Sequence, residues 1–325
     1  MNGAPSRWRL TDLQPRPRDL RADAIAGLST CPRTLPSKYF YDAAGSRLFE
    51  QITREPEYYP TRVETALLQE RIDEIAAAAG PQAHLVEYGS GSGRKTELLL
   101  EGLEDVVAYT PVEISREALL ASVERLTDRF PQVEMLPVCA DFTGPVPLPA
   151  PARPGRSRLL FFPGSTLGNF EHDEAVGLLR SMRETMGADG AVLVGIDLDK
   201  DPAVIEAAYN DAAGITAAFT LNLLHRLNRE LDAGFDVEGF VHRARYSVER
   251  RRIETDLVSL RDQHATIGGQ RFGFDEGEAI RVEYSHKYTD GDFAVMCAQA
   301  GLQIDRAWND ADDWFGLRLL RPSGG

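Results

Sequence analysis

The sequence predicts an α/β protein built on a doubly wound parallel sheet that carries a second lobe. Strand and helix patterns alternate from about Val63 to Asp199, as they do in such sheets. One of these strands runs directly into three alternating glycines and a helix start. From Pro202 the pattern changes to a helical region and then to long alternating strands, and this segment is too long for a crossover between sheet strands.

The change of pattern at Pro202 indicates an insertion before the last strands of the sheet. We expect helix over residues 208–229 and strands over 240–288, and we expect the amino-terminal segment to join this second lobe. The expected domains are residues 63–200 with 289–325 for the sheet, and residues 1–62 with 201–288 for the second lobe.

The first strand of the sheet ends at the pattern Glu87-x-Gly89-x-Gly91-x-Gly93, which we interpret as a cofactor-binding turn. Side chains at Gly89 and Gly91 would block the approach of the backbone to a ligand. The helix expected to start near Lys95 offers free N–H groups and the positive end of its dipole. A glycine-rich turn is also compatible with a plain flexible loop, so the interpretation depends on the strands that follow.

The next strand, expected over residues 106–112, ends at Glu113, about twenty residues after the glycines. A carboxylate there can accept hydrogen bonds from both hydroxyls of a ribose. The alternative is an acid that serves only the start of the next helix, for which Ser115 is the candidate N-cap. We favour the ribose contact.

A third strand, over residues 133–138, leads to Asp141 and Phe142, which offer an acceptor and an aromatic face for an adenine. The glycine turn, the acid and this pair follow strands one, two and three, at the edge where open parallel sheets bind ligands. The sequence therefore predicts a nucleotide-like cofactor. A nicotinamide dinucleotide would share the first two features, but its fingerprint would need glycine where Arg94 stands.

The rest of the sheet domain shows clear periodicity. A helical pattern follows Asn169 and keeps its apolar spacing to Met186, and the apolar run 191–198 predicts the next strand. We expect one more helix over residues 292–300.

Composition excludes several classes of function. The 50 acidic against 36 basic side chains give a formal net charge of −14, which repels polyanions, so we expect no nucleic-acid partner. The absence of an apolar run near the amino terminus or of membrane-span length predicts a cytoplasmic protein with no membrane partner. Cys31, Cys139 and Cys297 are widely separated and are expected to be buried, and we expect no metal site.

The glycine pattern resembles the first motif of the class I S-adenosylmethionine-dependent methyltransferases, which have a Rossmann-like fold. The segments 302–307 and 315–320 look like the antiparallel strands that close that fold. Four longer motifs carry a more specific resemblance that covers nearly the whole chain. Residues 41–62, 164–170, 209–219 and 283–288 resemble the L-histidine Nα-methyltransferases of ergothioneine biosynthesis.

This resemblance implies the transfer of three methyl groups in succession from S-adenosylmethionine to the α-amino group of L-histidine, which gives hercynine. It implies a small-molecule substrate, and we expect a monomer. The cofactor would be held by residues of the glycine turn and of the strand ends that follow it: Gly89, Gly91, Lys95, Glu113, Asp141 and Phe142.

The same resemblance implies a set of substrate contacts. Tyr58, Asn169 and Tyr209 would hold the substrate carboxylate. The Gly164 carbonyl would face the amine, and we assign catalytic roles to Tyr58 and Gly164. Glu283 and Ser285, helped by Tyr41, would hold the imidazole, and the aromatic faces of Tyr58 and Phe49 could accommodate a growing cation.

These residue types suit an imidazole, because a carboxylate and a hydroxyl can engage both ring nitrogens. Without the resemblance, Glu283 and Ser285 would be interpreted as one exposed face of a strand, and Asn169 as the cap of the following helix. Lys95 could be an ordinary first-turn lysine. Of the neighbouring tyrosines, we assign Tyr58 to the pocket and Tyr59 to the core.

Two positions depart from the family pattern. Glu113 stands where relatives have aspartate, and Thr255 stands where they have a methionine that packs near the imidazole. A related subgroup methylates indole-bearing substrates, so another aromatic amino acid such as tryptophan is the alternative substrate. Alternatives of a different class are a nicotinamide-dependent dehydrogenase and a non-catalytic ligand-binding protein.

Overall fold

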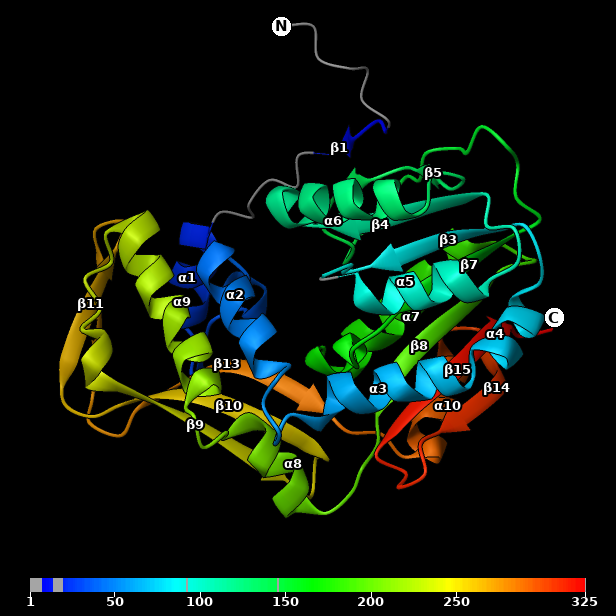
Figure 1. Ribbon diagram of the computed structural model, residues 1–325. Helices are drawn as coiled ribbons and strands as arrows, with labels where there is room; N and C mark the ends of the chain where they lie inside the picture. Colours follow the sequence, from blue (N-terminus) through cyan, green and yellow to red (C-terminus); the bar gives the residue numbers. More distant parts are fainter. Residues whose placement is uncertain (1–7, 14–19, 92, 145, 325) are drawn as a thin grey trace, which may run out of the picture. The chain divides into compact units, whose positions relative to one another are not determined.

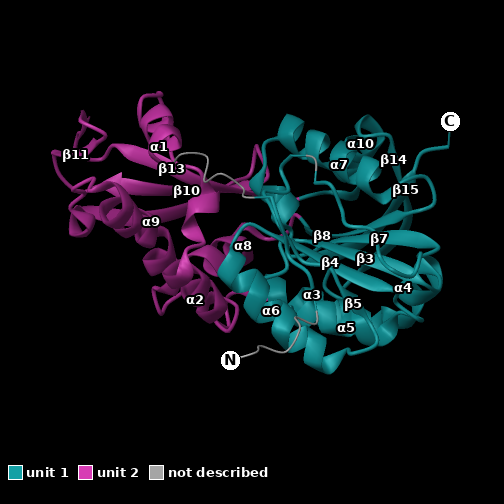
Figure 2. Cartoon of the chain, turned by 90° about the horizontal axis from the view of Figure 1, so that it is seen from above, with its two compact units in different colours: residues 1–15, 60–198, 288–325 teal, residues 16–59, 199–287 magenta. Residues whose placement is uncertain are grey.

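The computed structural model describes residues 8–13, 20–91, 93–144 and 146–324. They form two compact units (Figure 2). Unit 1 holds the described residues among 1–15, 60–198 and 288–325, and unit 2 holds those among 16–59 and 199–287.

Unit 1 is built around a sheet of nine strands among the described residues (Figure 1). The order is β1-β6-β4-β3-β7-β8-β15-β14, with β5 beside β4. The strands from β1 to β8 pair in parallel, and β15 runs antiparallel to both β8 and β14. The strands are Thr11–Asp12 (β1), Ala83–Tyr88 (β3), Ala108–Glu113 (β4), Glu134–Met135 (β5), Val138–Cys139 (β6), Ser157–Phe162 (β7), Ala191–Asp197 (β8), Leu302–Asn309 (β14) and Phe315–Pro322 (β15).

Helices cover both faces of this sheet. Successive residues of a strand point to opposite faces, so Val86 and Tyr88 of β3 pack in the core under α7 and α10, while Leu85 packs in the core under α3 to α6. A short 3₁₀ helix, η2, follows β7. The helices are Tyr59–Glu70 (α3), Ile72–Ala79 (α4), Arg94–Gly102 (α5), Arg116–Arg129 (α6), Thr166–Asn169 (η2), His172–Met186 (α7) and Asp290–Gln299 (α10).

Unit 2 combines a four-stranded sheet, in the order β2-β13-β10-β9, with a separate hairpin of β11 and β12. Its strands are Arg33–Thr34 (β2), Phe240–Ser247 (β9), Arg252–Ser259 (β10), Gln263–Ile267 (β11), Gln270–Phe274 (β12) and Ala279–His286 (β13). Its helices are Leu20–Leu28 (α1), Ser37–Phe40 (η1), Ala43–Ile52 (α2), Pro202–Tyr209 (α8), Ile215–Leu231 (α9) and Val237–Gly239 (η3). Phe40, Phe219 and Leu257 lie in its apolar core.

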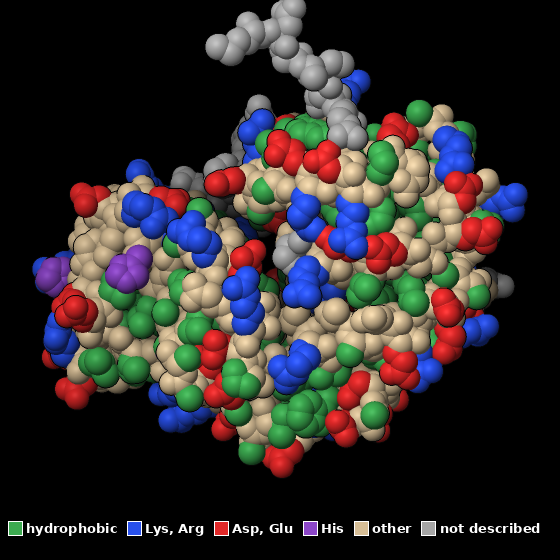
Figure 3. Space-filling model, in the orientation of Figure 1, with side chains coloured by type: hydrophobic (Ala, Val, Ile, Leu, Met, Phe, Trp, Pro, Cys, Tyr) green, Lys and Arg blue, Asp and Glu red, His purple; other side chains and the backbone are tan. Residues whose placement is uncertain are grey.

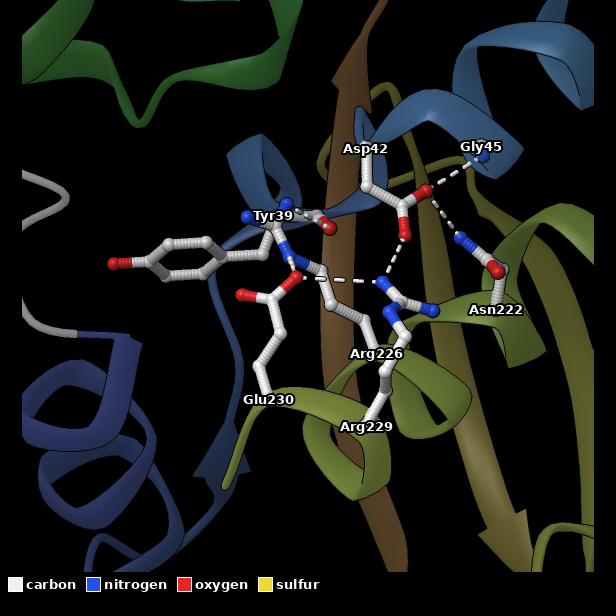
Figure 4. Close-up of polar contacts among 7 residues, drawn as sticks. All are labelled: Tyr39, Asp42, Gly45, Asn222, Arg226, Arg229 and Glu230. Carbon is white, nitrogen blue, oxygen red and sulfur yellow. Dashed lines mark hydrogen bonds and ion pairs between the residues drawn. The ribbon is translucent and has the colours of Figure 1, made fainter. Parts of the chain in front are cut away.

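Asp42, the N-cap of α2, ties this helix to α9 (Figure 4). Its carboxylate accepts hydrogen bonds from the Gly45 N–H at 2.7 Å and from Asn222 Nδ2 at 2.9 Å, and it pairs with Arg229. Burial opposes ionisation of Asp42, but the hydrogen bonds from these three groups outweigh it and lower the pKa of the carboxyl. The cap therefore fixes the start of the helix that carries Phe49.

We expect Asp42→Ala to lower the free energy of unfolding at neutral pH by about 1 to 2 kcal/mol, the scale of a lost N-cap. Because the folded-state pKa of Asp42 is depressed, its stabilisation is present above the unfolded-state pKa and is lost as the pH falls through the folded-state pKa. Urea unfolding of parent and variant at several pH values would measure this. A stability difference that stayed constant into strong acid would contradict the assignment.

Acidic and basic side chains are intermingled over the face shown in Figure 3. Within the described ranges, no helix combines the length and the apolar character that a membrane crossing needs.

The predicted fold class, an α/β doubly wound sheet with a second lobe, is confirmed. The expected third strand is divided into β5 and β6, because Pro137 between them has no N–H to donate to a ladder. The expected helix over 208–229 is two helices, α8 and α9, separated by a turn in which Gly214 has a φ of +73°. Strand β1 pairs with β6 in unit 1, although residues 1–62 were expected in the second lobe. Cys31 is exposed, contrary to the expectation that it is buried.

Candidate functional site

The glycine turn after β3 presents its backbone to open space. Gly89, Gly91 and Gly93 have φ values of +74°, +45° and +69°, a conformation that favours glycine. A Cβ atom on Gly91 would meet nothing within 4 Å, and one on Gly89 would meet only Phe142, at 3.7 Å. Helix α5 begins at Arg94 directly behind the turn. A ligand can therefore approach this backbone closely at the start of a helix.

Glu87, the acid of the glycine motif, is an internal anchor for this turn. Its buried carboxylate accepts hydrogen bonds from Thr96 Oγ1 of α5, at 2.6 Å, and from the Tyr109 hydroxyl of β4. Burial raises the pKa of Glu87 to about 7, although both hydrogen bonds oppose that shift. Glu87 thus links the end of β3 to helix α5 and to strand β4.

Glu113 lies at the end of β4, close to the glycine turn. Burial raises the pKa of its carboxyl, against hydrogen bonds from the backbone N–H groups of Ser115, Gly91 and Ile114. Ser115 caps α6, its hydroxyl oxygen accepting from the Ala118 N–H. The structure therefore confirms the cap predicted at Ser115 and places Glu113 beside Gly91.

The adenine pair follows β6. Asp141 Oδ1 accepts hydrogen bonds from the N–H and the hydroxyl of Thr143, at 3.0 and 2.6 Å. The Phe142 ring stacks on Tyr88, with ring centroids 5.5 Å apart, and lies near Gly89. The structure thus brings together Gly89, Gly91, Glu113 and Phe142. Open backbone, a carboxylate and an aromatic face are groups that fit a nucleoside attached to a charged tail.

Lys95 is held by Glu64, a residue to which the sequence analysis assigned no role. Glu64 lies on α3 and is fully buried, and its carboxylate pairs with Lys95 and accepts from the Gly164 N–H at 2.9 and 3.0 Å. Gly164 has a φ of +78° in the turn after β7. Glu64 therefore fixes both predicted residues. The sequence did contain a signal for the burial of Glu64, because Glu64 precedes Leu68 by four residues and so shares the apolar face of its helix.

Asn169 ends η2, in the same turn region as Gly164. It does not cap the following helix, so that alternative interpretation is wrong. The N-cap of α7 is Glu171, which forms a capping box with Glu174.

Four predicted aromatic residues form a cluster in unit 2. The ring of Phe49 lies 5.6 Å from that of Tyr41 and 6.2 Å from that of Tyr58, and the Tyr58 ring lies 6.4 Å from that of Tyr209. Tyr58 is partly buried, whereas the neighbouring Tyr59 is fully buried. The rings meet mostly edge to face, so this cluster can offer aromatic faces to a cation.

Glu283 and Ser285 lie on one face of β13, two residues apart. The Ser285 hydroxyl lies 2.7 Å from the Tyr209 hydroxyl, and Lys287 Nζ donates to both oxygens, at 2.9 and 3.0 Å. Burial raises the pKa of Glu283 to about 7, while the nearby positive charge of Lys287 lowers it. Tyr209, Glu283 and Ser285, predicted from separate motifs, thus belong to one polar group that Lys287 completes.

Thr255 is the direct cross-strand neighbour of Glu283, in the register of β10 against β13. The residue is 1% exposed, and its hydroxyl has no hydrogen-bond partner among the described residues. Cross-strand neighbours point to the same face, so Thr255 adds a buried hydroxyl beside the Glu283 carboxylate. An unpaired buried hydroxyl is costly, which favours a partner supplied by water or by a ligand.

Comparisons with known proteins identify the family. A histidine N-alpha-methyltransferase of Mycolicibacterium smegmatis is 39% identical over 308 residues, which cover 92% of this chain and 94% of that protein. Ergothioneine biosynthesis protein 1 of Neurospora crassa is 30% identical over 303 residues, covering 90% of this chain and 33% of that longer protein. The crystal structure of an S-adenosylmethionine-dependent methyltransferase from Clostridium acetobutylicum has a TM-score of 0.50 at 13% identity, covering 85% of this chain and 98% of that chain, and it supports the fold.

The family described as "Histidine-specific methyltransferase, SAM-dependent" matches residues 20–322. S-adenosylmethionine is the cofactor of this family, and the residues gathered around the glycine turn fit its adenosine and its charged tail. The nicotinamide-dependent alternative is thereby excluded. With a match over nearly its whole length, this chain belongs to the family of S-adenosylmethionine-dependent, histidine-specific methyltransferases.

Proposed function

We propose that this enzyme transfers three methyl groups in succession from S-adenosylmethionine to the α-amino group of L-histidine, giving hercynine for ergothioneine biosynthesis. The observation that carries the choice of substrate is the pair of Glu283 and Ser285 on one face of β13. A carboxylate requires a ring N–H and a hydroxyl can serve the second ring nitrogen, a combination that apolar amino acids cannot satisfy.

For the cofactor, the chain supplies binding and orientation. The open backbone at Gly89 and Gly91 would hold its amino-acid portion near the start of α5, and Glu113 would accept the ribose hydroxyls. Asp141 would accept from the adenine amine while Phe142 packs on the ring. Lys95, held by Glu64, places a positive charge beside the turn. When bound, S-adenosylmethionine supplies an electrophilic methyl group on a positively charged sulfur.

Different groups of the protein are proposed to contact the carboxylate and the amine of the substrate. The hydroxyls of Tyr58 and Tyr209 and the amide of Asn169 would hold the carboxylate, and the Gly164 carbonyl would accept from the amine. The α-amine of a free amino acid is protonated at neutral pH and must lose that proton before attack, and the main task of the protein is alignment. Glu64 contributes by fixing the turn that carries Gly164.

Successive transfers turn the amine into a permanent cation. The rings of Tyr41, Phe49 and Tyr58 lie close together in unit 2, and their aromatic character would stabilise that cation. We assign unit 1 to cofactor binding and unit 2 to recognition of the substrate side chain. We further propose a cytoplasmic monomer whose partner is a small molecule and that binds neither nucleic acid nor membranes.

The test of this function is mass spectrometry after incubation of the enzyme with S-adenosylmethionine and each of the twenty amino acids separately. We expect histidine to gain up to three methyl groups and the other amino acids to remain unmodified or nearly so. Preference for tryptophan would instead support the indole alternative. Binding of S-adenosylhomocysteine without any methyl acceptor would support the ligand-binding alternative.

A further inference from the structure

Lys287 is a buried cation at the centre of the polar group on unit 2. It follows β13 directly, and the residue is 3% exposed. Its backbone N–H donates to the Arg251 carbonyl at 2.7 Å, which fixes the start of the side chain. Its Nζ atom donates to Ser285 Oγ at 2.9 Å and to the Tyr209 hydroxyl oxygen at 3.0 Å.

These contacts determine whether the two hydroxyls donate or accept hydrogen bonds. A lysine ammonium has three donors and no acceptor, so both hydroxyl oxygens must accept from Lys287. A hydroxyl whose oxygen accepts from a cation can still donate its own proton. The two oxygens are 2.7 Å apart, so one hydroxyl donates to the other before the substrate binds. When both donate to the substrate this hydrogen bond is broken, and Lys287, which donates to both oxygens, holds the pair together.

We propose that Lys287 is a positioning residue that turns Ser285 and Tyr209 into hydrogen-bond donors toward the substrate. Ser285 donates to the unprotonated ring nitrogen of the imidazole, and Tyr209 donates to the substrate carboxylate. This inference rests on the proposed function, because it specifies how the same site recognises histidine.

With Ser285 as donor and Glu283 as acceptor, the site selects a neutral imidazole that has one N–H and one lone pair. An indole has the N–H but no ring acceptor, so it would leave the Ser285 proton without a partner. A buried donor without a partner costs free energy, and discrimination of this kind is stronger than exclusion by size. Lys287 therefore contributes to specificity without touching the ring.

The experiment compares two substrates, histidine and an analogue with pyrrole in place of imidazole, which keeps an N–H and lacks the acceptor nitrogen. The parent should prefer histidine. Lys287→Met removes all donors, and we expect it to lower kcat/KM for histidine by about tenfold, the scale of a hydrogen bond to a charged group. The loss should appear mainly in KM, because the contact is made equally in the ground state. The preference for histidine over the pyrrole analogue should shrink by a similar factor.

Two further variants distinguish a role of Lys287 in orienting the hydroxyls from a role in the stability of the fold. Lys287→Gln keeps amide donors and should recover part of the preference for histidine. Ser285→Ala should remove the preference by itself, and the double variant with Lys287→Met should lose little more, because both substitutions remove the same donor. Affinity for S-adenosylhomocysteine should be unchanged in each variant, which verifies an intact unit 1.

A full preference for histidine in Ser285→Ala, or additive losses in the double variant, would overturn the role of Lys287. If Lys287→Met does not fold, the selectivities of Ser285→Ala and Lys287→Gln test the role of Lys287 instead. Failure of the parent to methylate histidine would overturn the proposed function itself. An active parent with unchanged selectivity in the variants would overturn only the role of Lys287.

Discussion

Glu283→Ala is expected to reduce kcat/KM for histidine by about 30- to 150-fold, equivalent to roughly 2 to 3 kcal/mol for a charged hydrogen-bond partner in a partly buried site. The freed volume should at the same time narrow the discrimination against tryptophan and phenylalanine. The measurement is the ratio of kcat/KM for histidine to that for tryptophan, in variant and parent. The buried hydroxyl of Thr255, directly opposite Glu283, could hold a water that shares the ring contact and moderates the loss.

Glu283→Gln is the matched control, because it keeps the shape and an acceptor oxygen but removes the charge. The pKa of Glu283 is raised to about 7, so the parent should lose efficiency with histidine as the pH falls below 7 and the carboxylate becomes protonated. The loss of efficiency caused by protonation of Glu283 should be absent in Glu283→Gln. The loss caused by protonation of the substrate amine should remain in that variant. A histidine-to-tryptophan ratio that is the same in Glu283→Ala and parent would show that Glu283 does not recognise the side chain.

Glu113→Ala is expected to weaken S-adenosylmethionine binding by roughly 1.5 to 3 kcal/mol, the scale of charge-assisted hydrogen bonds to the ribose. The fold should be retained because the Ser115 cap of α6 remains, but stability should fall, since Glu113 also accepts from the backbone N–H groups of Ser115, Gly91 and Ile114. Calorimetric titration with S-adenosylhomocysteine would measure the affinity without turnover.

Two matched variants sharpen this test. Glu113→Asp keeps a carboxylate and should retain most of the affinity, whereas Ser115→Ala removes the helix cap and should affect stability more than cofactor binding. If Glu113→Ala bound S-adenosylhomocysteine as tightly as the parent, Glu113 would be an acid that serves only the helix start.

The cofactor end of the fold could be predicted from sequence because its signals are local. Apolar runs mark the strands and helical periodicity marks the helices, and parallel strands place their carboxyl ends at one edge. The glycine turn, Glu113 and the pair Asp141 and Phe142 each follow a strand, and the structure gathers Gly89, Gly91, Glu113 and Phe142. The substrate residues, by contrast, came only from the resemblance, since the periodicity of β13 alone favoured an exposed strand face.

Tertiary structure decided which charges are buried and what they touch. The helical pattern places Glu64 on the apolar face of α3 but does not show what it touches. The strand pattern does not show that Lys287, directly after β13, is removed from water. Only the folded chain brings Glu64 to Lys95 and Gly164, Thr255 to Glu283, and Lys287 to Tyr209 and Ser285. Lys287 and Ser285 are two positions apart, but the other pairs are separated by 28 to 100 positions, and contact between distant positions leaves no periodic trace in a single sequence. The sequence by itself therefore determined the elements and the cofactor edge, while the direction of the hydrogen bonds in the substrate site depends on packing.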